Sequence, residues 1–243
     1  MIEIIKSNLF KNYPEIIFGF STKIGLNRES PFYFNMSKSV GDEINIVEEN
    51  REAFFNQLNL KTEYIAFQKQ IHSAIVNVAQ KSGICGEGDA LITNQRNIGL
   101  AISSADCALI FIYDFKEKVI SGVHSGWRGT QQTILNKTLV KLQAQFNSKP
   151  QNLAVYIAPS ISQKNYEVGS EFHHYFDKKY LLPKNDKYLL DVKSANYDML
   201  INFGIPEQQI EVSDLCSYEE EYLHSYRREG IKSGRALGII ALR

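Results

Sequence analysis

The sequence predicts a mixed α/β or α+β protein, and three observations lead to this class. Short segments rich in β-branched and aromatic residues are interspersed with segments whose apolar residues recur at helical spacing. The two kinds of segment do not follow a strict strand–helix–strand rhythm. The length of 243 residues fits one large domain or two small ones, and no repeat or proline-rich linker interrupts the chain. We therefore expect a single domain over residues 1–243.

Three segments are expected to form strands. Residues 64–78 (YIAFQKQIHSAIVNV) are typical of extended backbone, and residues 118–124 (KVISGVH) predict a further strand. Residues 98–113 contain two apolar runs separated by Ser-Ser-Ala-Asp. This third segment is interpreted as one strand with an irregular middle or as two short strands.

Three further segments are expected to form helices. Apolar residues recur at helical spacing in residues 44–58 and in residues 130–146, where Thr130 is placed to cap the start. A third helix is predicted from about Val192 to Phe203, with Gly204 as its C-terminal stop.

Composition narrows the class of partner. Lysine plus arginine equals aspartate plus glutamate, 27 against 27, and no basic stripe suggests a nucleic-acid surface. No signal peptide or membrane-spanning apolar run is visible, and three scattered cysteines fit a reducing compartment. We expect a cytoplasmic protein with small-molecule ligands, and nothing indicates a protein partner.

Three places combine residue types that carry chemistry. His72 lies in the first predicted strand, where a structural, hydrogen-bonded histidine is the simpler interpretation. Cys107 follows the polar break at Ser103–Asp106, and free cysteine often packs as a small apolar residue. His124 ends a strand and is followed by a glycine-rich turn with Arg128. This junction suits anions, although strand–glycine–helix junctions are also common in proteins that bind nothing there.

Considered together, one thiol and two imidazoles indicate a metal site. Three protein ligands with an open fourth position are typical of catalytic zinc, and copper also binds thiolate and imidazole. The sequence alone does not establish that His72, Cys107 and His124 converge, because their spacing is long.

Longer motifs occur in order along most of the chain. They are FGFSTKIGLN, VGDEINIVEENR, QKQIHSAIV, GDALITNQRNIGLAISSADCALIFIYD, VHSGWRGT, IAPSISQKNYEVGSE, LDVKSANYDML and DLCSYEEEYLHSYRREGIKSGRA. This series resembles the laccase-domain, or polyphenol-oxidase-like, family of purine nucleoside processing enzymes. The combination of DALIT, ADC and VHSGWRG is highly specific.

The resemblance implies both a fold and an activity. It implies a four-layer αββα sandwich with two mixed sheets, and zinc bound by His72, Cys107 and His124. The implied activities are phosphorolysis of adenosine, inosine, guanosine and methylthioadenosine, together with adenosine deamination. The implied ligands are therefore a purine nucleoside and phosphate.

Further site residues are carried over at matching positions, which are Asn35, Asp89, Asp106, Arg128, Cys216, Arg227 and Arg228. We expect Asp106 and Arg128 to be catalytic, although strand alternation would point Asp106 away from the Cys107 thiol. We expect Lys23, Asn35, Arg128, Arg227 and Arg228 to bind the substrate. Lys23 stands where the family often has arginine. Lysine keeps the positive charge but lacks the bidentate fork of arginine. Cys85 and Cys216 are interpreted as non-ligands.

Two enzymatic alternatives are a copper-dependent polyphenol oxidase and a hydrolase with Cys107 as nucleophile and a histidine as base. The chain has five histidines, which is few for several copper ions. A third alternative is a partner-binding protein with structural zinc. This alternative needs a fourth protein ligand, and none is evident.

Overall fold

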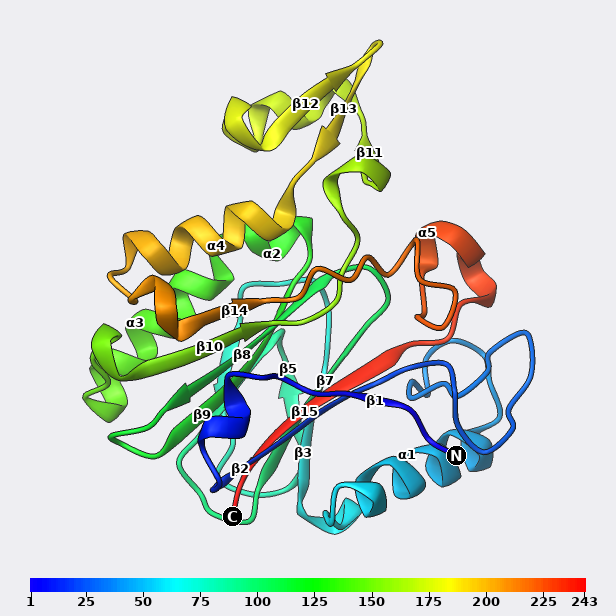
Figure 1. The fold of residues 1–243 in the computed structure, drawn as a ribbon, viewed down its shortest axis with the longest axis vertical. Coiled ribbons are helices and arrows are strands. Elements are labelled where there is room, and N and C mark those ends of the chain that lie inside the picture. Colours follow the sequence, from blue (N-terminus) through cyan, green and yellow to red (C-terminus); the bar gives the residue numbers. More distant parts are fainter.

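Two six-stranded sheets form the centre of the protein, which is described over residues 1–243 by a computed structural model (Figure 1). In spatial order, the first sheet, sheet A, contains β1 (Ile4–Ile5), β2 (Ile16–Ser21), β15 (Ala236–Leu242), β7 (Gly99–Ser104), β3 (Ile65–Lys69) and β5 (Gly83–Glu87). The second, sheet B, contains β14 (Ile210–Val212), β10 (Leu153–Ile157), β8 (Ala108–Asp114), β9 (Val119–Ser125), β6 (Ala90–Thr93) and β4 (Val76–Val78). Both sheets mix parallel and antiparallel pairs, as expected.

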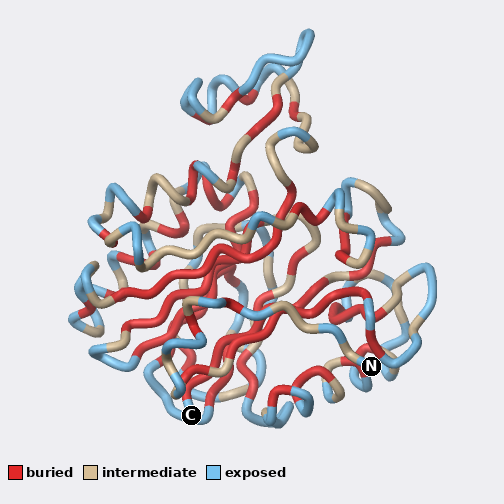
Figure 2. The backbone as a smooth tube through the Cα atoms, in the orientation of Figure 1, coloured by how far each residue is buried: buried red, intermediate tan, exposed pale blue.

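The sheets pack face to face with helices on their outer faces, so the four-layer αββα arrangement is confirmed. Large apolar side chains from both sheets, including Phe18 and Phe111, fill the space between them. Helix α1 (Ile44–Gln57) packs Phe54 and Phe55 on the outer face of sheet A. Helices α3 (Ile134–Phe146) and α4 (Val192–Asn202) cover the outer face of sheet B. Figure 2 shows the buried strands through the middle of the molecule.

A small third sheet projects from this body. It consists of β11 (Glu167–Val168), β13 (Lys187–Leu190) and β12 (Leu181–Lys184), seen at the top of Figure 1. Its apolar side chains form a separate cluster that reaches down to Ala108 and Trp127. The projecting sheet is therefore anchored beside the start of β8.

The helix predictions agree with the structure at α1 and α4, where Gly204 adopts the positive φ expected of a helix stop. The helix predicted over 130–146 is confirmed at residues 134–146, but it does not begin at Thr130. The chain forms α2 (Trp127–Gln131), breaks at Thr133 with φ 58°, and restarts as α3. Thr130 lies inside α2 and does not cap it. A last short helix, α5 (Tyr226–Glu229), precedes β15.

The strand predictions are confirmed at residues 98–113, which form the two short strands β7 and β8. The segment 64–78 is not continuous, because it forms β3 and β4 with a turn between them. His72 lies in that turn with φ 56°, so strand alternation does not describe its side chain. No helix has the length and apolar character needed to cross a bilayer.

Candidate metal centre

Three separate segments bring His72, Cys107 and His124 together. His72 belongs to the turn after β3 in sheet A, and Cys107 lies just before β8 in sheet B. His124 is in β9, which pairs with β8 so that His124 lies opposite Leu109. The centre therefore forms where the two sheets meet, at the ends of β7 and β9 and the start of β8.

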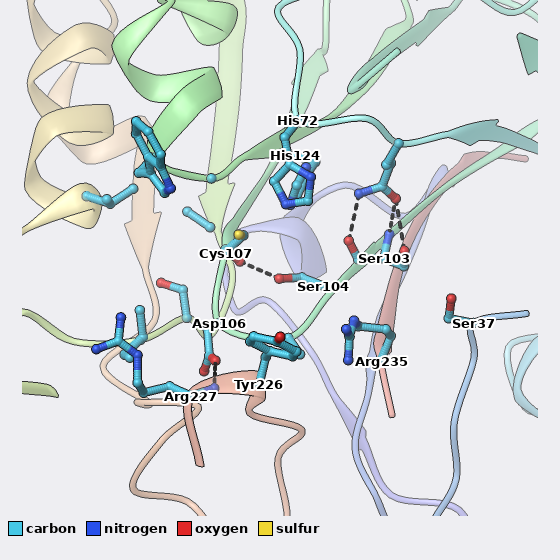
Figure 3. A pocket seen from close by; sticks show the side chains of 18 of the residues that line it. Ser37, His72, Ser103, Ser104, Asp106, Cys107, His124, Tyr226, Arg227 and Arg235 are labelled. Atoms are coloured by element: carbon cyan, nitrogen blue, oxygen red, sulfur yellow. Dashed lines mark hydrogen bonds between the residues drawn. The ribbon is translucent and has the colours of Figure 1, made fainter. Parts of the chain in front are cut away.

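Hydrogen bonds hold the His72 turn against sheet A. Gln70 Nε2 donates to the Ser103 carbonyl at 2.8 Å. Gln70 Oε1 accepts from the Ser103 backbone N–H at 2.8 Å and from its hydroxyl at 3.0 Å. These three bonds fix the turn to the end of β7, and Figure 3 shows them to the right of the histidines.

The candidate ligand atoms lie close enough to share one ion. The imidazole nitrogens of His72 and His124 and the Cys107 Sγ are all within 4.8 Å of one another, and no other such cluster of His, Cys, Asp or Glu is present. The two rings meet edge to face with centroids 4.9 Å apart. His124 is buried, Cys107 is partly buried and His72 is exposed, so the centre opens to solvent on one side.

The carboxylate of Asp89 holds both histidines in position through hydrogen bonds. Its fully buried carboxylate lies 2.9 Å from His124 Nδ1 and accepts hydrogen bonds from the backbone N–H groups of His72 at 3.1 Å and Ser73 at 2.6 Å. A carboxylate on Nδ1 fixes the proton there and leaves Nε2 free as a ligand, which is the usual support of a metal-bound histidine.

Electrostatics favour a charged Cys107–His124 pair. Burial opposes ionisation of the Cys107 thiol, but the charges and hydrogen bonds of His124 and His72 outweigh it and lower the thiol pKa. Burial likewise opposes protonation of His124, while Cys107 and Asp89 raise its pKa. A readily formed thiolate is the form of cysteine that binds metal.

Gly126 leaves room for the sulfur. A methyl group at this position would lie 2.8 Å from Cys107 Sγ. Its φ of −67° is accessible to any residue, so the close approach explains the glycine here. The thiolate and two imidazoles, the support from Asp89 and the space at Gly126 together fit a metal ion such as zinc.

A cavity of about 480 Å³ opens beside these three residues (Figure 3). It is lined by Ser37, Ser39, Gln70, His72, Ser103, Ser104, Ala105, Asp106, Cys107, Ala108, His124, Gly126, Trp127, Ser160, Ile161, Tyr166, Val192, Tyr226, Arg227 and Arg235. The volume is in the range typical of small-molecule sites.

Asp106 lies in the cavity wall with Cys107, and its carboxylate points away from the Cys107 sulfur, toward Arg227 (Figure 3). Asp106 has φ 84° in the turn between β7 and β8, where strand alternation does not apply. Its carboxylate accepts hydrogen bonds from the Ser217 hydroxyl and from the Arg227 backbone N–H, both at 2.7 Å. These two bonds tie the segment around α5 to the centre.

The other predicted site residues are distributed differently. Arg227 lines the cavity, where its guanidinium lies over the Tyr166 ring at 5.2 Å. Arg228 donates to four backbone carbonyls, including those of Ser217 and Tyr218, and so stabilises the loop before α5. Lys23 is paired with Glu229. Neither Arg228 nor Lys23 lines the cavity.

Asn35 and Arg128 also lie outside the cavity lining. Asn35 is fully buried, and its side chain is hydrogen-bonded on both sides. Arg128 is exposed, with its guanidinium over the Trp127 ring at 4.3 Å. The structure gives little support to the anion site expected at the helix start, because α2 has only five residues and therefore a small helix dipole.

Several cavity residues were not predicted. They are Gln70 and Ser103, which fix the His72 turn, and Trp127, Tyr166 and Arg235 in the walls. Arg235 carried one sequence signal, since it is a lone charge between the Ser-Gly turn and the apolar run of residues 236–242.

Comparison with known proteins gives consistent results. Residues 17–243 match the family model for multi-copper polyphenol oxidoreductase laccase. A purine nucleoside phosphorylase from Bacteroides thetaiotaomicron is 31% identical over 228 residues, which cover 86% of this chain and 84% of the relative. Adenosine deaminase RL5 from an unknown prokaryotic organism is 30% identical, with 97% of each chain covered.

Solved structures agree with the fold. The YfiH protein of Bacillus licheniformis superposes with a TM-score of 0.92 at 27% identity, over 100% of this chain and 96% of that chain. YlmD from Geobacillus stearothermophilus gives a TM-score of 0.89 at 28% identity, over 98% and 94% of the two chains.

Proposed function

The chain belongs to the multi-copper polyphenol oxidoreductase laccase family, and we propose that it is a zinc-dependent purine nucleoside phosphorylase that also deaminates adenosine. The proposed substrates are adenosine, inosine, guanosine and methylthioadenosine, with phosphate as co-substrate. The convergence of His72, Cys107 and His124 on one side of an open cavity is the observation that carries this proposal.

Relatives support the reaction class. Proteins about 30% identical to this chain over most of their length are named purine nucleoside phosphorylase or adenosine deaminase. Both reactions act on one class of substrate, and both fit one cavity. The two activities differ in the reagent that must enter, which is phosphate for one and water for the other.

The purine base would bind at the apolar wall. Ala108, Trp127, Tyr166 and Val192 line the cavity and also belong to one apolar cluster under the projecting sheet. Flat aromatic rings beside small apolar side chains suit a heteroaromatic base. This wall adjoins Cys107, which directly precedes Ala108.

Asp106 is the proposed proton-handling residue. Its carboxylate lies in the cavity wall and is held in place by Ser217 and Arg227. From there it would exchange a proton or a hydrogen bond with the bound nucleoside. Zinc held by the three ligands supplies Lewis-acid chemistry at its open position when bound.

Two competing activities make different predictions. A multicopper phenol oxidase needs more histidines than this chain places near the centre, since His173 and His174 are exposed and His224 is buried against Phe34. A hydrolase using Cys107 as nucleophile would keep its activity without metal.

The deciding experiment is an incubation of metal-analysed protein with adenosine, with and without phosphate, followed by chromatography. Adenine with ribose 1-phosphate identifies phosphorolysis, and inosine identifies deamination. A chelator should abolish both reactions. Full activity after metal removal would favour the thiol hydrolase, and oxidation of a phenol by copper-loaded protein without any nucleoside reaction would favour the oxidase.

A further inference from the structure

The cavity has a second wall that is polar and cationic. Ser37, Ser39, Gln70, Ser103 and Arg235 lie on this wall. In Figure 3, Ser37, Ser103 and Arg235 lie to the right of Cys107, while Asp106 and Arg227 lie below it and to its left. The polar wall therefore forms a distinct end of the cavity.

Buried hydrogen bonds hold Arg235 and Ser37 side by side. Asn35 Oδ1 accepts from the backbone N–H of Ser37 and from that of Arg235, each at 2.9 Å. Asn35 Nδ2 donates to the Ser37 carbonyl at 2.9 Å. Asn35 itself is fully buried. A segment near the N-terminus and the start of β15 are thus joined at one point of the cavity wall.

The charge of Arg235 has no carboxylate partner. No ion pair involves it, and its guanidinium bonds are made by Nη1 to the Ser233 carbonyl at 2.6 Å and the Gly234 carbonyl at 2.9 Å. No protein acceptor lies on Nε or Nη2, and the guanidinium packs against the Tyr226 ring at 5.4 Å. A half-buried arginine with free donors is suited to an anionic ligand.

The other basic residues near the cavity are already engaged. Lys23 pairs with Glu229, and Arg228 is bonded to backbone carbonyls. Arg227 donates to the Glu167 carbonyl at 2.8 Å, and its own N–H is bonded to the Asp106 carboxylate. A second anion beside Asp106 would be repelled by that carboxylate. Arg235 makes no hydrogen bond to Asp106. Burial lowers the pKa of Arg235, and the charges of Asp106 and Cys107 counteract this lowering only through space.

We propose that Arg235, with Ser37 beside it, forms the subsite that binds inorganic phosphate for phosphorolysis. This inference rests on the proposed function and assigns its co-substrate to one end of the cavity. The planar guanidinium offers two parallel donors to two phosphate oxygens, and the Ser37 hydroxyl, when it accepts from the Ser39 hydroxyl at 2.9 Å, can donate to a third.

The assignment is chemically balanced. A phosphate oxygen forms a bond to C1′ of the nucleoside, the C1′–N9 bond breaks, and the purine leaves with the electron pair and takes up a proton. Ribose 1-phosphate and free base result. Arg235 keeps its charge throughout and counters the phosphate charge at the polar end, opposite the apolar wall proposed for the purine.

Kinetics of Arg235→Gln test the subsite. We expect the KM for phosphate in adenosine phosphorolysis to rise by about 10-fold or more, because a bidentate charged contact is lost. The KM for adenosine should change much less, and phosphate-independent deamination should fall less than phosphorolysis. The KM for phosphate of Arg235→Lys should lie between those of Arg235→Gln and the wild type. The exposed Arg96→Gln is the matched control and should behave as wild type.

A binding measurement separates this inference from the proposed function. Inorganic phosphate is titrated into metal-loaded protein without nucleoside by calorimetry, after circular dichroism and metal analysis show that each variant is folded and loaded. The wild type and Arg96→Gln should bind phosphate, and Arg235→Gln should not. Equal binding by Arg235→Gln, or no binding by the wild type, overturns the subsite. If the wild type binds phosphate through Arg235 but turns over no nucleoside, the proposed function alone is refuted.

Discussion

The carboxylate of Asp89 lies 2.9 Å from Nδ1 of His124 and also accepts hydrogen bonds from the backbone of the turn that carries His72. One buried side chain therefore positions two of the three candidate ligands. Its pKa is lowered: burial acts in the opposite direction, but the hydrogen bonds and charge of His124 and the hydrogen bonds from Ser73 prevail. Asp89 thus stays ionised at neutral pH. Removing its charge should weaken metal binding while all three candidate ligands remain in place.

The variant Asp89→Asn should bind zinc about 10- to 100-fold more weakly, as is typical when the partner of a ligating histidine is changed. Competition with a chromophoric chelator measures this affinity. The exposed Asp186→Asn is a matched control that makes the same chemical change away from the centre. Wild-type affinity in Asp89→Asn would show that this carboxylate does not support the metal.

The variant His124→Ala should lose the metal, because it removes the most buried of the three donors. Elemental analysis of the purified protein is the measurement. The exposed His174→Ala controls for the loss of any histidine and should keep a full complement. One zinc per chain in His124→Ala would contradict the ligand assignment.

The variant Gly126→Ala probes the space around the sulfur. Its new methyl group would lie 2.8 Å from Cys107 Sγ, so the sulfur must move and zinc affinity should fall. The backbone should tolerate alanine, since φ is −67°. Thermal melting of the metal-free protein should therefore change little. Unchanged zinc affinity would mean that the sulfur is not a ligand.

The variant Asp106→Asn separates chemistry from metal binding. We expect kcat for the nucleoside reaction to fall by about 100-fold or more, which is the usual contribution of a proton-transferring group. Metal content should remain at the wild-type level, because Asp106 is not one of the three candidate ligands. Steady-state kinetics on metal-analysed samples give both quantities, and a wild-type kcat would exclude Asp106 as the acid or base.

Acid sensitivity should come partly from His224. Burial is the main cause that lowers its pKa to about 3, and its Nδ1 has no hydrogen-bond partner. The unfolded chain takes up a proton below about pH 6.5 while the folded chain does not, so stability falls as the pH falls. The loss amounts to about 2 kcal/mol between pH 7.5 and 5.

Urea unfolding of the wild type and His224→Gln at both pH values tests this expectation. The pH-dependent loss should be about 2 kcal/mol smaller in the variant. The exposed His173→Gln should retain the wild-type dependence. If His224→Gln and the wild type lose equal stability, His224 is not the responsible group.

The sequence predicted the fold class and the helices at residues 44–58 and 192–203 because apolar periodicity reports which face of a helix is buried. It could not predict the turn at His72, because residues 68–76 contain no glycine or proline to mark a break in the extended backbone. The break at Thr133 was missed for a related reason, since threonine is not a residue type that favours positive φ.

The candidate metal ligands were predictable from residue type, but their meeting point depends on strand pairing between distant segments. Arg235 was not predicted as a site residue. What distinguishes it is the absence of an ion-pair partner, and a single sequence does not show which charged residues are paired in the fold. The roles of Asn35 and Arg228 were likewise visible only from their hydrogen-bond partners.

Strand β15 (Ala236–Leu242) lies in the middle of sheet A, between β2 and β7. During synthesis, the ribosome therefore delivers the central strand of this sheet after the strands on either side of it. Until then β1 and β2 have no neighbour through which to join β7 and β3, whereas every strand of sheet B precedes residue 213. We expect sheet A to be completed only after translation of β15, so premature termination before Ala236 should leave a nascent polypeptide that chaperones and proteases treat as unfolded.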